Sequence, residues 1–214
     1  MQGYKSIFIQ NAYECGALRF GEFILNSGRL SPFFFNTGLF ADGKSINAIA
    51  NAYCESIMHN QIEFDMLFGP AYKGIPLITA IAQIIYQRKN QTVAFSFNRK
   101  EKKKHGEKGS LVGAKIKSNV LIIDDVISSG ISIAQSINTI IENGGNIASI
   151  LVALDRKERK ESATNGENPS SIIGNIPVFS IINFFDILDF VKSDSKLKRY
   201  TESLVRYHEK YGIN

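Results

Sequence analysis

The sequence predicts an α/β fold with a mostly parallel central sheet that is flanked by helices. Apolar, strand-like segments alternate with helix-like segments from about residue 64 to residue 183, and this alternation is typical of a parallel sheet covered on both faces. With 214 residues and 44% hydrophobic content, the chain can bury a full core. No linker or low-complexity segment divides it, so we expect a single domain over residues 1–214.

The N-terminal region is expected to contain two helices and a hairpin. The first helix lies near residues 4–17, and two short strands follow in FGEFIL and SPFFFN, joined by a turn at residues 26–29. Asp42 suits the cap of a helix through INAIANAYCESIM. We expect residues 1 to about 40, together with the C-terminal helices, to form a small hood.

The remaining elements follow the α/β alternation. The expected strands are FDMLFGP, TVAFSFN, NVLIIDDV, NIASILVALDR and PVFSIIN. The expected helices are GIPLITAIAQIIYQ, ISIAQSINTIIENGG, NFFDILDFVKS and KLKRYTESLVRYHEKYG. Ligands of such sheets bind beyond the carboxyl ends of the strands, which is where GPAYKG, FNRK, DDVISSG and Asp155-Arg156 all fall.

Composition favours a cytoplasmic protein that binds a small anion. The N-terminal segment mixes charged and apolar residues, unlike a signal peptide, and no stretch approaches the roughly 20 apolar residues of a membrane span. Cys15 and Cys54 are isolated and lack metal-type spacing. Residues 99–108, RKEKKKHGEK, hold six Lys or Arg against two Glu and so carry most of the net charge of +5. One concentrated cluster suggests a polyanionic small ligand rather than nucleic acid.

The segment VLIIDDVISSG at residues 120–130 carries the chief chemical signal. Two unpaired carboxylates are costly to bury, so we expect Asp124 and Asp125 at an open strand end. One of them could simply cap the following helix. The hydroxyl-rich, glycine-containing turn at the start of that helix, however, suits a phosphate, while carboxylates suit sugar hydroxyls or hydrated Mg²⁺. A ligand that carries both a ribose and a phosphate fits the whole segment.

This segment resembles the phosphoribosyl-diphosphate signature of type I phosphoribosyltransferases. The resemblance extends to the bacterial orotate phosphoribosyltransferase family in FGEFIL, SGR, SPFFFN, FDMLFGPAYKGIP, FNRKE, KHGE, LVGA, DDVISSG and LDRKER, in that order along the chain. The implied reaction joins orotate to the ribose 5-phosphate of phosphoribosyl diphosphate (PRPP), with Mg²⁺ bound mainly through the substrate and no metal ligand set of the protein's own. Asn26 stands where the family usually has lysine, and because an amide cannot neutralise phosphate charge, this position is left out of the implied site.

The resemblance also implies roles for individual residues. Lys103, Asp124 and Asp125 are the implied catalytic residues. The implied PRPP contacts are Tyr72, Lys73, Arg99, Lys100, Lys103, His105, Asp124, Asp125, Val126, Ile127, Ser128, Ser129, Gly130, Ile131 and Ser132, with an unusual non-proline cis peptide in the GPAYKG loop. The implied orotate contacts are Phe34, Phe35, Ser128 and Arg156. A homodimer with shared sites is implied as well, in which a mobile loop of about residues 99–109 closes over the partner's site.

Each of these motifs has a structural alternative. GPAYKG could be no more than a helix start with an exposed lysine, Phe33-Phe34-Phe35 could be core packing, and Arg156 lies in the mixed run DRKERKE, which alone is typical of a solvated surface. Two other functions also stay open. These are a phosphoribosyltransferase for another base, and a non-catalytic regulator that senses PRPP.

Overall fold

The centre of the molecule is a six-stranded sheet. The structure is a computed structural model that describes residues 3–25, 27–99, 111–127, 130–159 and 173–213. The strands run in the order β5-β4-β3-β6-β7-β8, and every neighbouring pair is parallel except β4 with β5. Their bounds are β3 (Met66–Phe68), β4 (Ala94–Asn98), β5 (Leu111–Gly113), β6 (Ser118–Val126), β7 (Gly145–Asp155) and β8 (Val178–Asn183). The predicted mostly parallel sheet is therefore confirmed.

The short edge strand β5 is not among the strands that the sequence predicts. It has three residues, LVG, and pairs with the last residues of β4. A segment of three residues is too short to show the alternation of apolar and polar side chains by which strands are recognised.

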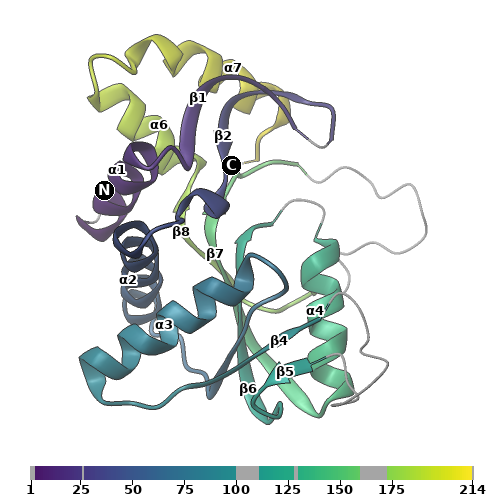
Figure 1. Ribbon diagram of the computed structural model, residues 1–214. Helices are drawn as coiled ribbons and strands as arrows, with labels where there is room; N and C mark the ends of the chain where they lie inside the picture. Colours follow the sequence, from purple (N-terminus) through teal and green to yellow (C-terminus); the bar gives the residue numbers. More distant parts are fainter. Residues whose placement is uncertain (1–2, 26, 100–110, 128–129, 160–172, 214) are drawn as a thin grey trace.

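Helices cover both faces of this sheet (Figure 1). Helices α2 (Gly43–His59) and α3 (Gly74–Lys89) pack on one face, where Leu121 and Ile123 of β6 join their apolar side chains. Helix α4 (Ile131–Glu142) packs on the other face, against Val120 and Ile122. Successive strand residues point to opposite faces, and both faces are buried. Burial on both faces explains why residues 120–123 of β6 form a continuous apolar run, which the two carboxylates follow.

The hood consists of the N-terminal hairpin and three helices (Figure 1). Strands β1 (Leu18–Ile24) and β2 (Leu30–Phe35) form an antiparallel pair. Helices α1 (Gly3–Glu14), α6 (Phe184–Ser193) and α7 (Thr201–Tyr211) surround it, and two short 3₁₀ turns, η1 (Thr37–Leu39) and η2 (Lys198–Tyr200), complete the set. The ring of Tyr207 on α7 meets the ring of Phe33 on β2 edge-on at 6.4 Å. Segments from the two ends of the chain are thus packed together.

Helix α2 begins where the sequence predicts. The Asp42 carboxylate accepts a hydrogen bond from the Ser45 backbone N–H at 2.8 Å, and the Ser45 hydroxyl accepts one from the Asp42 N–H at 3.2 Å. This reciprocal capping satisfies backbone donors that have no partner within the helix. Among the described residues, no helix is both long and apolar enough to cross a membrane.

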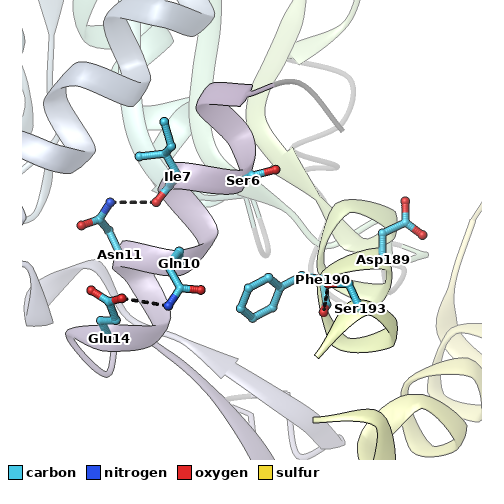
Figure 2. A pocket seen from close by; sticks show the side chains of 8 residues that line it. All are labelled: Ser6, Ile7, Gln10, Asn11, Glu14, Asp189, Phe190 and Ser193. Atoms are coloured by element: carbon cyan, nitrogen blue, oxygen red, sulfur yellow. Dashed lines mark hydrogen bonds between the residues drawn. The ribbon is translucent and has the colours of Figure 1, made fainter. Parts of the chain in front are cut away.

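The surface of the described residues includes two hollows that bear on function. The larger, of about 740 Å³, is an open groove between α1 and α6 (Figure 2). Its lining residues are Ser6, Ile7, Gln10, Asn11, Glu14, Asp189, Phe190 and Ser193. None of them belongs to a motif that the sequence marks as chemical. The smaller hollow, of about 550 Å³, is lined by Tyr72 and Lys73 together with η1 and the start of α2, and this one lies at the candidate site.

Candidate active site

The two adjacent carboxylates lie inside strand β6 and not beyond it. The strand runs to Val126, and Asp124 is only 7% exposed, whereas Asp125 is half-buried. The expectation of an open strand end is therefore wrong for Asp124. Its carboxylate accepts a hydrogen bond from the Asp125 N–H at 2.9 Å, and its backbone carbonyl accepts one from the Tyr53 hydroxyl at 2.7 Å. Tyr53 thus connects helix α2 to the carboxyl end of β6.

The Asp125 carboxylate is engaged by two donors from other parts of the chain. Lys73, from the loop after β3, forms an ion pair with Oδ2 of Asp125 at 2.7 Å. The hydroxyl of Thr37, in η1, donates to the same oxygen at 3.1 Å. Because the Lys73 side chain is half exposed, an incoming anion can compete for it without disturbing the core. The loop after β3 and the hood therefore meet at one carboxylate.

The GPAYKG loop has the cis peptide that the resemblance implies. It lies between Ala71 and Tyr72, and the Ala71 N–H donates to the side chain of Asn98 at 2.9 Å. Gly69 and Gly74 approach so closely that a Cβ on Gly69 would lie 2.5 Å from the Gly74 carbonyl oxygen. Only glycine permits this contact between backbones. The loop is thereby folded so that Tyr72 and Lys73 are exposed at the hollow.

Helix α4 begins directly beyond the carboxylate pair. Gly130 is its N-terminal cap, with a φ of 79°, a conformation that glycine adopts without strain. A glycine cap has no side chain that could accept hydrogen bonds from the backbone N–H groups of the first turn. These N–H groups are therefore available to bind an anion. Val126 and Ile127 are half-buried before this turn, while Ile131 and Ser132 are exposed within it.

Arg156 lies at the carboxyl end of β7, beside the end of β6. Its side chain is only 10% exposed, so the alternative of a solvated surface run is wrong for this residue. The guanidinium lies over the Phe33 ring, with its carbon 4.0 Å from the ring centroid. It also contacts Ser31 and Glu158. A largely buried arginine that is held through Nε and Nη2 at a strand end is a candidate ligand group.

The three phenylalanines of β2 divide between two faces, as a strand requires. Phe33 and Phe35 are buried, whereas Phe34 is half-buried and stacks on Phe23 at 5.5 Å. Phe35 packs edge-on against Phe8 in the hood. Phe33, which lies beneath Arg156, is therefore the phenylalanine that the structure brings to this guanidinium. Phe34 and Phe35 are the ones that the resemblance implies.

Some of the implied contacts can be placed only in part. Arg99 directly follows the last residue of β4, and its Nη1 is buried without a hydrogen bond to the described part of the chain. An unpaired guanidinium nitrogen suits an anionic ligand. The other candidates Lys100, Lys103, His105, Ser128 and Ser129, and the departure Asn26, lie outside the described residues.

Four residues at this site are not among those that the sequence suggests. They are Ser31, Thr37, Tyr53 and Glu158. Ser31, Thr37 and Tyr53 each contact a partner at least 71 residues away, and Glu158 is held by Tyr207, 49 residues along the chain. No local pattern marks such a pairing.

The Asp124 carboxyl gives the site a predictable pH dependence. Burial, and next to it the negative charge of Asp125, raises the pKa of the Asp124 carboxyl from 3.8 to about 7. Between these values the folded protein holds a proton that the unfolded chain has lost, so stability falls as pH rises toward 7 and then levels off. We expect Asp124→Asn to weaken this dependence. Urea unfolding at about pH 5 and about pH 8 measures it.

The matched control is Asp189→Asn, which changes an exposed carboxyl on α6. It should leave the difference in unfolding free energy between the two pH values as it is in the unmodified protein. An unchanged difference in Asp124→Asn would mean that Asp124 is ionised throughout this range.

Known proteins share both the sequence and the fold of this chain. The family model of the phosphoribosyl transferase domain matches residues 39–179. The orotate phosphoribosyltransferase of Legionella pneumophila is 45% identical, with 99% of each chain covered, and that of Janthinobacterium sp. is 42% identical, with 100% of each covered. A crystal structure of the Francisella tularensis orotate phosphoribosyltransferase superposes with a TM-score of 0.81 at 36% identity, covering 96% of this chain and 99% of that one.

These similarities extend over the carboxylate pair, the GPAYKG loop, Arg156 and the hood, because they cover nearly the whole chain. The hood lies partly outside the matched domain model, which begins at residue 39, yet the full-length relatives include it. The chain belongs to the orotate phosphoribosyltransferase family.

Proposed function

We propose that this protein transfers the ribose 5-phosphate group from PRPP to orotate, giving orotidine 5′-monophosphate and diphosphate in pyrimidine biosynthesis. The observation that carries the proposal is the juxtaposition of three groups at one sheet edge. The carboxylate pair lies in the last three residues of β6, the start of α4 follows it, and the largely buried Arg156 directly follows the adjacent β7. Ribose, phosphate and an acidic base can each find a complementary partner there.

The carboxylate pair suits the ribose. As the bond from C1 of the ribose to the diphosphate lengthens, the sugar gains positive charge, and nearby carboxylates stabilise that charge. Asp124 and Asp125 are proposed to accept hydrogen bonds from the ribose hydroxyls. The turn of Val126, Ile127, Ser128, Ser129, Gly130, Ile131 and Ser132 is proposed to bind the 5′-phosphate.

Cationic side chains suit the diphosphate, which gains negative charge as it leaves. Lys73 already faces Asp125 at 2.7 Å, so it can exchange this carboxylate for a diphosphate oxygen when the substrate enters. The Nη1 of Arg99, which has no hydrogen-bond partner among the described residues, supports the same assignment. The further diphosphate contacts that we propose from the family resemblance are Tyr72, Lys100, Lys103 and His105.

The carboxylate of orotate is proposed to bind Arg156. A guanidinium can bind a carboxylate through two parallel hydrogen bonds, and burial of the side chain strengthens such a pair. Ser128, Phe34 and Phe35 are proposed as the other orotate contacts.

Mg²⁺ is proposed to bind mainly through the substrate. Asp124 and Asp125 provide the hard oxygen donors that this ion prefers. Among the described residues there is no cluster of three or more His, Cys, Asp or Glu side chains that could hold a metal ion. When bound, the ion would neutralise charge on the diphosphate. We further propose that the chain acts as one domain in the cytoplasm, to which its free thiols, Cys15 and Cys54, are suited.

One ultraviolet assay distinguishes this function from its alternatives. Orotate, uracil, adenine and hypoxanthine are each supplied with PRPP and Mg²⁺. We expect turnover with orotate alone. Turnover with another base would reassign the substrate, and no turnover with any base would favour a PRPP-sensing regulator.

We also propose a homodimer whose active sites are shared, with Lys103 serving the partner's site, as the family resemblance implies. If two inactive variants, Lys103→Ala and Asp125→Asn, exchange subunits, each heterodimer has one site with both lesions and one with neither. Random exchange then restores roughly a quarter of the activity, since half of the dimers are mixed and each of these has one intact site. Native mass spectrometry confirms the exchange. A mixture that exchanges and stays inactive would place Lys103 in its own subunit's site.

A further inference from the structure

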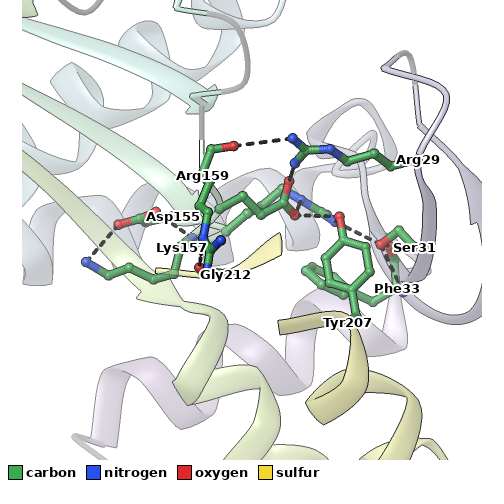
Figure 3. A network of polar contacts seen from close by, with 10 residues as sticks. Arg29, Ser31, Phe33, Asp155, Lys157, Arg159, Tyr207 and Gly212 are labelled. Atoms are coloured by element: carbon green, nitrogen blue, oxygen red, sulfur yellow. Dashed lines mark hydrogen bonds and ion pairs between the residues drawn. The ribbon is translucent and has the colours of Figure 1, made fainter. Parts of the chain in front are cut away.

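A polar network that includes Ser31 and Tyr207 joins three distant parts of the chain (Figure 3), and Arg156 belongs to it. Its Nε donates to Oε1 of Glu158 at 2.6 Å, and its Nη2 donates to the hydroxyl of Ser31, on β2, at 2.8 Å. The hydroxyl of Tyr207, on α7, donates to the same Glu158 oxygen at 2.9 Å. The Ser31 hydroxyl in turn donates to the Phe33 carbonyl at 2.7 Å.

These contacts use one edge of the guanidinium and one of its faces. Nε is bound to Glu158 and Nη2 to Ser31, with the Tyr207 hydroxyl a more distant acceptor for Nη2 at 3.5 Å, and the ring of Phe33 covers a face at 4.0 Å. Nη1 makes no hydrogen bond to the described residues. Because the five donors of a guanidinium lie in one rigid plane, fixing the first edge also fixes the direction of the second. The second edge, which carries Nη1, is left for a ligand.

Glu158 is held from several sides. Besides Arg156 and Tyr207, Arg29 of the hairpin approaches its other carboxylate oxygen at 3.4 Å. Burial is the main cause that raises the pKa of Tyr207, which keeps its hydroxyl a hydrogen-bond donor. The Tyr207 side chain is buried between Phe33 and Tyr211. The C-terminal helix thus determines where the Glu158 carboxylate lies.

We propose that Glu158 and Tyr207 are positioning residues that orient the Arg156 guanidinium toward the carboxylate of the base. Tyr207 holds Glu158, and Glu158 holds the Nε edge of Arg156, so that the other edge is fixed before the ligand arrives. Such preorganisation strengthens binding because less freedom is lost on association. The inference rests on the proposed function, since it takes Arg156 to bind orotate.

A purely structural role for this network is the competing explanation, and backbone contacts allow the two to be separated. The Ile213 N–H donates to the Lys157 carbonyl at 2.8 Å, and the Arg159 N–H donates to the Tyr211 carbonyl at 2.8 Å. Arg159 Nε also donates to the Gly212 carbonyl at 3.0 Å. Residues 157–159 are therefore attached to the C-terminal residues by contacts that do not involve the Tyr207 hydroxyl. Removing this hydroxyl tests orientation rather than attachment.

The experiment compares two nucleotides that differ only in one carboxylate. Orotidine 5′-monophosphate carries it and uridine 5′-monophosphate lacks it, so the ratio of their dissociation constants, measured by calorimetry, reports the interaction between Arg156 and the carboxylate without turnover. We expect Tyr207→Phe to reduce this ratio about five- to tenfold and to leave the affinity for uridine 5′-monophosphate unchanged. Tyr211→Phe, on the same helix, is the matched control and should keep the full ratio.

Glu158→Ala should reduce the ratio further, because both Nε of Arg156 and the Tyr207 hydroxyl lose their partner. Its control is Glu202→Ala on α7, whose carboxylate pairs with Arg206 at an exposed position. In an Arg156→Ala background, Tyr207→Phe should have no further effect, since a positioning residue acts only through the group that it positions. If Glu158→Ala fails to fold, Tyr207→Phe decides the question.

The outcomes separate this inference from the proposed function. An unmodified protein that does not prefer orotidine 5′-monophosphate and does not convert orotate contradicts the proposed function itself. An unmodified protein that shows the preference, with the full ratio retained in Tyr207→Phe, overturns the positioning role and leaves the function intact. An equal effect of Tyr207→Phe with and without Arg156 overturns it as well.

Discussion

Replacing Asp124 and Asp125 together by asparagine is expected to reduce turnover roughly 10²–10³-fold while the protein stays folded. Each asparagine keeps the shape of the side chain but removes the negative charge that stabilises the cation-like ribose. A loss of about 3–4 kcal/mol of transition-state stabilisation corresponds to this decrease in rate. Steady-state assays with orotate and PRPP measure it.

The structure gives a reason to expect that the fold survives. Asp124 is buried, and its raised pKa means that the ionised form is disfavoured in the folded state. An asparagine oxygen can still accept the Asp125 N–H, and the Tyr53 hydroxyl binds the backbone, which does not change. Circular dichroism and the midpoint of thermal unfolding check this. The matched control is the exposed pair Asp65→Asn and Asp189→Asn, with activity expected to be unchanged.

Either of two results would contradict the assignment. An unfolded double variant would make the carboxylates structural, and a folded double variant with normal turnover would remove them from the ribose site.

The sequence was sufficient to predict the sheet because each central strand is recognisable from its apolar composition and from the helix-like segments that precede or follow it. β6 contains the unbroken apolar run VLII at residues 120–123, and the helix that follows it has a clear apolar face. The edge strand β5 has neither mark. Its partner β4 gives it a place in the sheet by backbone hydrogen bonds, for which almost any sequence suffices.

The candidate site could be predicted in kind but not in its contacts. Adjacent carboxylates before a glycine-containing turn indicate a ribose and phosphate site wherever they occur. The burial of Asp124 could not be read from them, because it depends on distant segments such as helix α2, whose Tyr53 contacts this residue. Likewise, the run DRKER has the composition of a surface. Arg156 is buried only because Phe33 and Tyr207, far away in the sequence, cover it.

Arg156→Ala is expected to raise the KM for orotate roughly 10²-fold and to change the KM for PRPP far less. The guanidinium offers one free edge for two charge-assisted hydrogen bonds to the base carboxylate, and losing about 3 kcal/mol of binding accounts for the change. The diphosphate is assigned to other groups, among them Lys73 on the loop after β3. Initial rates with each substrate varied in turn give both constants.

The control for this prediction lies one residue away. Lys157 carries the same charge and pairs with Asp155 at 3.2 Å, but its side chain is one-third exposed and does not enter the network around Glu158. Lys157→Ala should therefore leave both KM values close to those of the unmodified protein. If Arg156→Ala raises the two KM values equally, the arginine supports the site as a whole and does not bind the base. The alternative result is that only the KM for orotate rises and that Lys157→Ala has no effect. The position and orientation of the guanidinium then select orotate, and positive charge near these strand ends is not sufficient.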